Sequence, residues 1–278
     1  MASSTSRKTI CNLVYDGTLE LKGKAGSKPY YSGVVVTEDK LLVIDYDDCN
    51  LQLYSQHDGK LLSSHRLESI PYGVCLISKT KVAVCLVDSI VILSFKSKDD
   101  VKLVKTLDVS TGFYRCDSVA KLKSDKLVVS GSEDDMLRWG IVSITDGRVG
   151  STHYICNEDI ASPTHLAVKD NTVYFSCETY DSTTAGVYAY DIFNPHTQKF
   201  LYQHKQLKIP GSIMAGRDSV FVSDRNSNRI HQLTDGGQLV TIHRGSSWLC
   251  GIFYDDHGVI YTTSWRSNKI TLYRVEYS

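Results

Sequence analysis

The feature that most constrains the fold of this chain is a pair of apolar strands that recurs six times. The first strand of each copy begins at Gly33, Gly73, Ser118, His165, Ser212 and Gly251, at intervals of 40, 45, 47, 47 and 39 residues. A polar turn and a second apolar run follow each of these positions, as in Leu41 to Ile44 and Val220 to Val222. Self-similarity at this period is typical of repeat architectures, in which each copy is one supersecondary unit.

Each copy contains a third strand, and three copies continue through a tight turn into a fourth. The turns carry Asp58-Gly59, Asp146-Gly147 and Asp235-Gly236, a dipeptide that accepts positive φ in hairpins. The unit is therefore a four-stranded antiparallel blade, and six blades predict an all-β, six-bladed propeller that forms a single domain over residues 1–278. The predicted blades cover residues 30–69, 70–110, 111–159, 160–208, 209–247, and 248–278 together with 18–24.

The last blade has no room for a fourth strand before the chain ends at Ser278. Asp16-Gly17 copies the turn that precedes other fourth strands, and residues 18–24 then stand at the right distance from blade one. We therefore expect residues 18–24 to complete blade six and close the ring. Residues 10–15, before that turn, are expected to add an outermost strand.

Composition limits the partners and the compartment. The chain has 31 basic and 31 acidic side chains and no net charge, so it has no overall field to attract nucleic acid or a membrane. No apolar run is long enough to span a membrane, and the first residues lack the apolar core of a signal peptide. The eight cysteines show neither Cys-x-x-Cys nor metal-ligand spacing, so we expect buried free thiols and a cytoplasmic protein.

Blade five resembles a known repeat. Its sequence from Val220 to Ile230 resembles the second strand, turn and third strand of an NHL repeat, with Asp224 and Asn228 in the turn. Blade six matches more loosely from Ile260 to Ile270, and Pro71-Tyr72-Gly73 is similar to the family's entry into the first strand. The resemblance spans residues 9 to 278 and is weakest in blades three and four. Residues 128–139 of blade three are also similar to a WD repeat, which implies the same architecture.

The NHL resemblance implies a role in recognition. NHL propellers are known chiefly as the recognition domains of tripartite-motif (TRIM-NHL) ubiquitin ligases, which bind proteins or RNA. This sequence has no RING or B-box pattern of cysteine and histidine, so ligase activity is not carried by these residues. We therefore expect a non-catalytic module without a cofactor.

Turns between second and third strands, and the links between blades, share one face of a propeller. On this chain nearly every blade delivers an aromatic residue to that face, and aromatic rings suit binding surfaces. The candidate ligand-binding residues are Tyr31, Tyr46, Tyr72, Tyr114, Arg115, His165, Tyr180, Arg225, Trp248, Trp265 and Arg266. The alternative is that these rings pack under neighbouring loops. Trp265, Arg266 and Arg225 are the strongest candidates for exposed functional groups.

Three other functions are alternatives to protein or peptide binding: a lectin, a metal-dependent hydrolase and an RNA-binding protein. A lectin that stacks sugars on Trp265, Trp248 or Tyr72 is the main alternative to a protein or peptide binder. A metal-dependent hydrolase would need axial ligands, and His165 is the one such residue at the first-strand positions; a single histidine makes no metal site. The other eight histidines are expected in solvent. RNA binding is disfavoured because the turns of blades one to four are mainly acidic.

Overall fold

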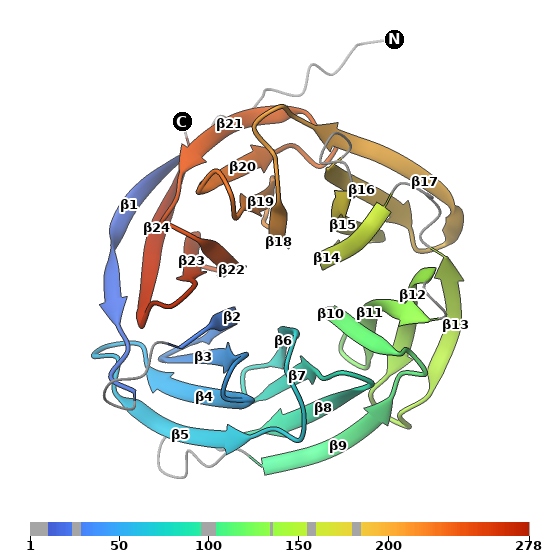
Figure 1. The fold of residues 1–278 in the computed structure, drawn as a ribbon, viewed down its shortest axis with the longest axis horizontal. Helices are drawn as coiled ribbons and strands as arrows, with labels where there is room; N and C mark the ends of the chain where they lie inside the picture. Colours follow the sequence, from blue (N-terminus) through green and yellow to red (C-terminus); the bar gives the residue numbers. More distant parts are fainter. Residues whose placement is uncertain are drawn as a thin grey trace.

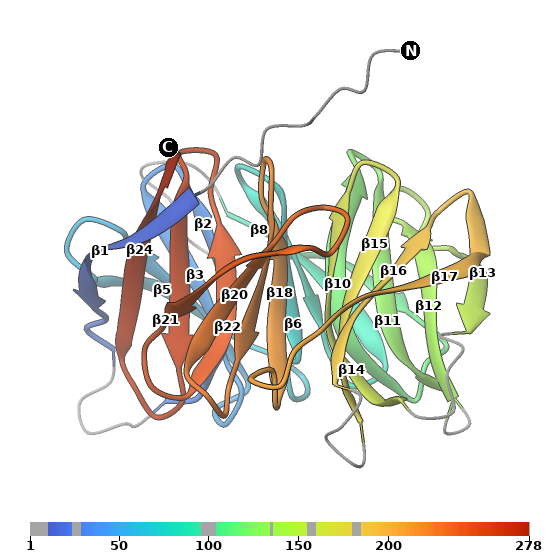
Figure 2. The same cartoon turned by 90° about the horizontal axis from the view of Figure 1, so that it is seen from above.

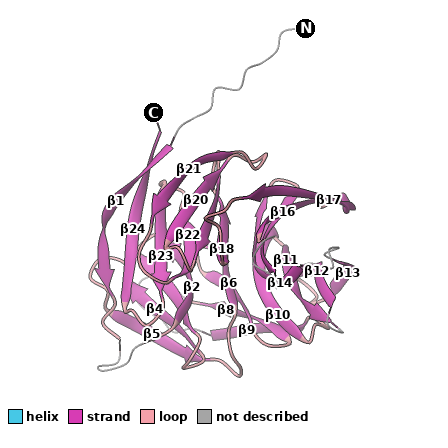
Figure 3. Ribbon diagram, turned by 45° about the horizontal axis from the view of Figure 1, so that its top comes forward, coloured by secondary structure: helices cyan, strands magenta, loops and turns pink. Residues whose placement is uncertain are grey.

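The computed structural model describes residues 11–23, 29–95, 104–133, 136–154, 160–179 and 185–277. These residues form 24 strands in six four-stranded antiparallel sheets and contain no helix (Figure 3). The sheets stand around a central axis, with one edge of each facing the axis and the other at the rim (Figure 1). The chain is therefore a six-bladed β-propeller, as the repeat predicts.

Each blade is built from the axis outward in chain order. Blade one contains β2 (Tyr31–Thr37), β3 (Lys40–Asp45), β4 (Asn50–Ser55) and β5 (Leu61–Arg66), and blade two contains β6 (Gly73–Ser78), β7 (Lys81–Cys85), β8 (Ser89–Ser94) and β9 (Val104–Ser110). Blade three contains β10 (Arg115–Lys123), β11 (Lys126–Glu133), β12 (Met136–Ser143) and β13 (Val149–Tyr154). Blade four contains β14 (Ile160–Lys169), β15 (Thr172–Thr179), β16 (Gly186–Asp191) and β17 (Asn194–Gln203), and blade five contains β18 (Pro210–Ala215), β19 (Val220–Asp224), β20 (Arg229–Leu233) and β21 (Leu239–Arg244). Blade six contains β22 (Leu249–Tyr254), β23 (Val259–Ser264), β24 (Lys269–Tyr277) and, from the other end of the chain, β1 (Cys11–Glu20).

Ring closure by an N-terminal strand is confirmed, but the strand is longer than predicted. β1 pairs antiparallel with β24 from Cys11 to Glu20, and the register shifts between Tyr15 and Gly17. Asp16-Gly17 is therefore a bulge inside one strand and not a hairpin turn, so the separate outer strand expected before it is wrong. The bulge is held by the Arg274 guanidinium, which donates to the Asp16 carboxylate at 3.0 Å.

The tight turns before the fourth strands use glycine for its left-handed backbone. Gly59 and Gly147 have φ values of 66° and 67°, as the Asp-Gly pairs predict. In blade five the positive φ of 82° falls on Gly237 and not on Gly236, one residue later than expected.

The core lies between the blades. Six clusters of buried apolar side chains fill the six interfaces, and each takes residues from two neighbouring sheets. In β3, Leu42 and Ile44 pack against blade two, whereas Leu41 and Val43 pack against blade six. Both faces of this strand are buried, so alternate side chains on it belong to two different interfaces.

The inner strands approach each other so closely that a side chain at some positions would force the neighbouring backbone to shift. A Cβ on Gly251 would stand 3.0 Å from the Cα of Gly33, and one on Gly73 would stand 3.1 Å from the Cα of Ser118. These contacts are with backbone, which cannot swing aside. The glycines that mark the repeat in the sequence therefore stand where neighbouring blades meet near the axis.

The structure tests what the sequence predicts for the cysteines and for the histidines. The six cysteines whose side chains are described are free thiols, and five of them are buried. The expectation that all other histidines lie in solvent is wrong for His231, which is fully buried and whose Nδ1 lies 2.7 Å from the Tyr202 hydroxyl. None of the described residues forms a helix that would span a membrane.

Removal of residues 1–20 should cost most of the free energy of unfolding or cause aggregation, because it exposes the edge of β24 and opens the ring. Thermal denaturation and size-exclusion chromatography measure both effects. A deletion of residues 1–9 keeps all of β1 and should melt close to the full chain. Cooperative melting of the longer deletion within a few degrees of the full chain would disprove the role of closure.

His231 should make stability depend on pH. Burial lowers its pKa from 6.5 to about 4, so the unfolded chain binds a proton more tightly than the folded one. Its stabilising contribution is full above pH 6.5 and is lost as pH falls toward 4, which amounts to about 2 kcal/mol between pH 7 and 5. Asp45 and Asp117, whose pKa values burial raises to about 6, act in the opposite direction.

Chemical denaturation of wild type and His231→Gln at pH 7 and pH 5 isolates this contribution. The variant should lose less stability on acidification, because glutamine does not titrate. Parallel losses in the two proteins would show that His231 does not carry the effect.

Candidate functional site

One face of the propeller collects the turns and links that carry the aromatic residues. Adjacent strands in each blade are antiparallel, so the turn from second to third strand lies at the end where the first strand begins. Figure 2 shows the blades from the side, with these connections at the ends of the strands. Tyr46 and Trp265 lie in such turns, and Tyr30, Tyr72 and Trp248 lie in the links before first strands.

Five of these rings form a continuous aromatic arc across blades two, one and six. Ring centroids are 5.8 Å apart for Tyr72 and Tyr46, 5.1 Å for Tyr46 and Tyr30, 6.4 Å for Tyr30 and Trp265, and 5.2 Å for Trp265 and Trp248. These separations and the tilted or edge-on angles are those that aromatic pairs prefer. The arc is therefore a preassembled surface and not a set of isolated side chains.

Two arginines contact rings of the aromatic arc, one at the Tyr72 end and one at Trp265. The guanidinium of Arg115 is 6.0 Å from the Tyr72 ring, and that of Arg266 is 4.3 Å from the Trp265 ring. Arg115 also donates from Nε to the buried Asp117 carboxylate at 2.5 Å. Both cations thus rest on aromatic faces, an arrangement that orients them.

The most exposed ring of the arc, Trp248, is held in a strained conformation. Its side chain is 54% exposed and its φ is 56°, a left-handed conformation that costs energy for a residue other than glycine. The Trp248 backbone N–H donates to Asn228 Oδ1 of blade five at 2.6 Å, and its carbonyl accepts from the Trp265 N–H at 3.0 Å. Blades five and six together hold the backbone of Trp248 in place.

The neighbouring turn residue Asp224 is structural. Its buried carboxylate accepts from the backbone N–H groups of Lys208, Ile209 and Asn226 and from the Ser227 hydroxyl, at 2.6–3.1 Å. It joins the link from blade four to the turn of blade five. Asp224 and Asn228 therefore serve the architecture, as their place in the repeat suggests.

The structure places most of the predicted site residues on this face and corrects one. Tyr31 is buried, and its hydroxyl lies 3.0 Å from that of Tyr54 inside the interface between blades one and six, so it is not a surface residue. Its neighbour Tyr30, which the sequence did not single out as a candidate, is the one in the arc. Tyr114 is 83% exposed, whereas Trp265 is half-buried among Tyr30, Trp248 and Arg266. Tyr180 lies outside the described residues.

A bulge explains why Tyr30 and Tyr31 exchange roles. The register between β2 and β3 shifts between Tyr31 and Gly33, so one extra residue enters β2 there. The same irregularity occurs near the start of β10, β14, β18 and β22. A bulge interrupts the alternation of side chains, and an alternating apolar pattern carries no signal for it.

His165 belongs to a second region, the central channel, and Arg225 lies in the turn after β19 on the face where the inner strands begin. His165 lines a cavity of about 170 Å³ between the inner strands. Burial, together with the nearby charge of Arg225, lowers the pKa of His165 to about 4, so the imidazole is neutral at pH 7. No three His, Cys, Asp or Glu side chains of the described residues gather in an arrangement that would hold a metal ion.

No family model matches the sequence, and no curated protein matches it. Solved structures do match the fold. A luciferin-regenerating enzyme superposes with a TM-score of 0.67 at 15% identity and covers 93% of this chain and 95% of its own. A chain of a nidogen/laminin complex gives 0.65 at 12% identity over 87% and 97%, and the β-propeller domain of Cps50 (Swd1) from Myceliophteria thermophila gives 0.62 at 13% identity over 96% of both chains. At these identities the likeness supports the propeller fold alone.

Asn228→Ala should lower the free energy of unfolding by about 2 kcal/mol and weaken the near-ultraviolet circular dichroism of the Trp248–Trp265 pair. The substitution removes the acceptor of the Trp248 N–H and places a Cβ residue without a side-chain hydrogen bond at φ 55°. Asn228→Gly relieves the backbone strain and should cost about half as much in stability, with the same spectral change. The control Asn226→Ala, in the same turn and exposed, should leave both unchanged. An unchanged spectrum in both Asn228 variants would refute the proposed support of Trp248.

Proposed function

We propose that this chain is a non-catalytic recognition module that binds a protein or peptide through the aromatic arc of Tyr72, Tyr46, Tyr30, Trp265 and Trp248. The observation that carries the proposal is the continuous contact of these five rings, with Trp248 held outward in a strained conformation. Strained residues cluster at binding sites, and tryptophan, tyrosine and arginine dominate the energetics of protein interfaces.

Carboxylates in the turns of blades one and two favour a partner with basic side chains at that part of the arc, whereas the cations Arg115 and Arg266 lie on the Tyr72 and Trp265 rings. Asp47, Asp48 and Asp88 lie in the turns next to Tyr46 and Tyr72, and all three are exposed. Burial raises the pKa of Tyr30 to about 12 and that of Tyr72 above its usual value, so these hydroxyls are neutral at pH 7. A lysine or arginine of the partner would find aromatic faces and carboxylates within one short stretch. The same carboxylates repel phosphates, which makes nucleic acid an unsuitable partner.

The NHL-type assignment remains part of this proposal. The hydrogen bonds of Asp224 and Asn228 support it, because they give a structural reason for an Asp and an Asn at these two positions of a repeat. Alignment with relatives of higher identity is the test: NHL relatives should keep both residues in several blades.

A catalytic role has less support. One structurally similar protein is named as a luciferin-regenerating enzyme, but a shared fold does not transfer an activity. In this chain His165 stands in the channel without a metal-binding group of described residues around it. Metal analysis of the purified protein tests the hydrolase alternative. Stoichiometric zinc or calcium would support a hydrolase.

We also propose a cytoplasmic location, which the free, buried thiols support. Subcellular fractionation of cells that express the chain tests it; recovery in the secreted fraction would oppose it.

Peptides selected from a displayed random library should bind the propeller and should be enriched in lysine or arginine. Tryptophan fluorescence measures the affinity. Trp248→Ala should weaken binding about 30-fold or more, as expected for an exposed anchor residue, and added salt should weaken it further. The control Phe193→Ala removes an even more exposed aromatic ring from the hairpin between β16 and β17, outside the arc, and should bind as wild type.

Two outcomes would contradict the proposal. Saturable binding to a glycan panel that is lost in Trp248→Ala would identify a lectin that uses the same surface. Peptide binding that survives both Trp248→Ala and Tyr72→Ala would place the interface elsewhere on the propeller.

A further inference from the structure

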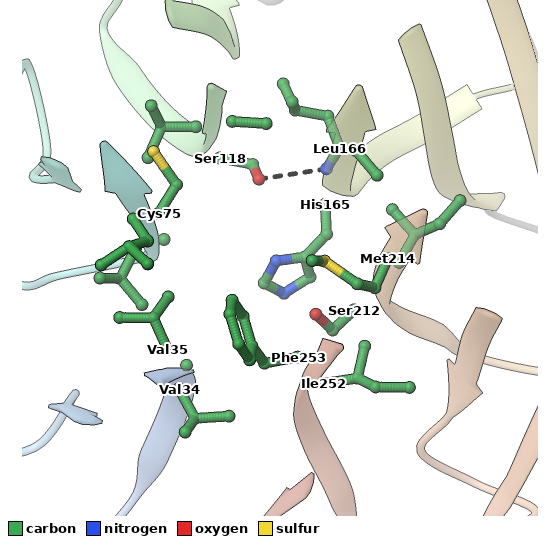
Figure 4. A pocket seen from close by; sticks show the side chains of 18 of the residues that line it. Val34, Val35, Cys75, Ser118, His165, Leu166, Ser212, Met214, Ile252 and Phe253 are labelled. Carbon is green, nitrogen blue, oxygen red and sulfur yellow. Dashed lines mark hydrogen bonds between the residues drawn. The ribbon is translucent and has the colours of Figure 1, made fainter. Parts of the chain in front are cut away.

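The central channel contains a cavity whose walls are mainly apolar, with Ser32, Ser118, Lys121, His165 and Ser212 as its polar lining residues. Its volume is about 170 Å³, and it is lined by the inner strands of the blades (Figure 4). Leu76, Met214, Ile252 and Phe253 are among its apolar walls. An apolar cavity of about 150 Å³ in another protein accepts benzene, so this space suits a benzene-sized group.

One side of the cavity is polar. His165 enters from β14, and Figure 4 shows its imidazole pointing into the space beside Met214, Ser212 and Phe253. Among the described residues neither ring nitrogen has a hydrogen-bond partner. Ser118 is already engaged, because its hydroxyl accepts from the Leu166 N–H at 3.1 Å. His165 therefore presents a donor and an acceptor to whatever occupies the channel.

Arg225 lies in a turn on the face of the propeller where the inner strands begin. It follows β19 in the turn of blade five, and its charge acts on His165 and Glu178 of blade four, on Cys250 of blade six and on Tyr30 of blade one. Arg225 and His165 are therefore close enough for their charges to interact. The Arg225 Nε is buried and has no hydrogen-bond partner in the part of the chain that the structure describes.

A buried guanidinium N–H without an acceptor is costly, and a ligand oxygen would remove that cost. Carboxylates match the planar donor arrangement of a guanidinium better than a neutral hydroxyl does. A phosphate is less suitable, because its larger charge would have to enter a space with apolar walls. The combination of an apolar cavity, a neutral imidazole and an unpaired guanidinium donor thus selects for one kind of molecule.

We propose that the central channel binds a small monocarboxylate, with a benzene-sized apolar body in the cavity and the carboxylate between Arg225 and His165. In this arrangement the Arg225 Nε–H and one imidazole N–H donate to the two carboxylate oxygens. The site uses none of the five rings of the aromatic arc, although Arg225 is close enough to act on Tyr30, and it goes beyond the recognition function proposed for the arc.

Benzoate is the probe that tests this site. Saturation-transfer NMR and isothermal titration with wild-type protein should show binding with a Kd of about 1 mM, a value typical of a ligand with so few atoms. Benzyl alcohol, which has the same ring and no charge, should bind at least tenfold more weakly. Equal affinity for the two probes would overturn the assignment of a carboxylate.

Variants separate the channel from other surfaces. Arg225→Gln and His165→Leu should each weaken benzoate binding about tenfold or more, since each removes a hydrogen bond to a charged group. Ala120→Leu adds bulk to the cavity wall and should abolish binding of both probes. The control Arg217→Gln removes an exposed arginine from the turn between β18 and β19, at the opposite end of the blade, and should bind as wild type.

Near-ultraviolet circular dichroism verifies that each variant is folded. If His165→Leu fails to fold, Arg225→Gln and Ala120→Leu still decide the question. Absence of benzoate binding to folded wild type at 20 times the expected Kd would overturn the proposal, as would equal binding to Arg225→Gln, Ala120→Leu and wild type.

Discussion

Burial of both faces of every blade is the constraint on which the rest of the structure depends. In β3 all six residues are buried, and successive apolar side chains join the core clusters on opposite sides of the blade. A sheet with two apolar faces needs a neighbour on each, so a row of such sheets is stable only if it closes on itself. Closure follows from the apolar pattern of the middle strands.

Closure of the ring also explains why β1, near the start of the chain, belongs to the last blade. Blade six contains β1, so the first and last strands of the chain pair with each other inside one sheet. Close packing supports this pairing of the two ends. A Cβ on Gly59 would collide with the carbonyl of Glu20, so the hairpin of blade one packs directly against the end of β1.

The same geometry creates both candidate sites. Six inner strands converge on the axis, and their packing leaves the channel with His165 in its wall. The links into these strands bring residues from blades two, one and six into one arc. Asn228 of blade five then fixes the backbone of Trp248 in blade six, so a contact that belongs to the fold also orients the most exposed ring of the surface.

The repeat could be found in the sequence because each blade packs against a neighbour on both faces and therefore repeats the same apolar spacing. Six blades, their strand order and closure by the N-terminal strand were predictable on that ground, as were Tyr46, Tyr72 and Trp248 on the shared face. Alternation in the sequence, however, assumes that every strand is regular. The bulge in β2 buries Tyr31 and leaves Tyr30 in the arc, and the bulge at Gly17 makes β1 one strand where a turn was expected.

The amino-acid sequence by itself determined the architecture of this protein, because apolar periodicity and turn residues act locally and recur in every blade. Tertiary structure alone decided which polar and aromatic groups meet. His231 became buried beside Tyr202 of the neighbouring blade, and Arg225 of blade five came close enough to His165 of blade four for their charges to interact. Such contacts join residues from different blades, and they depend on how closely the strands approach around the axis, a distance that no local pattern encodes.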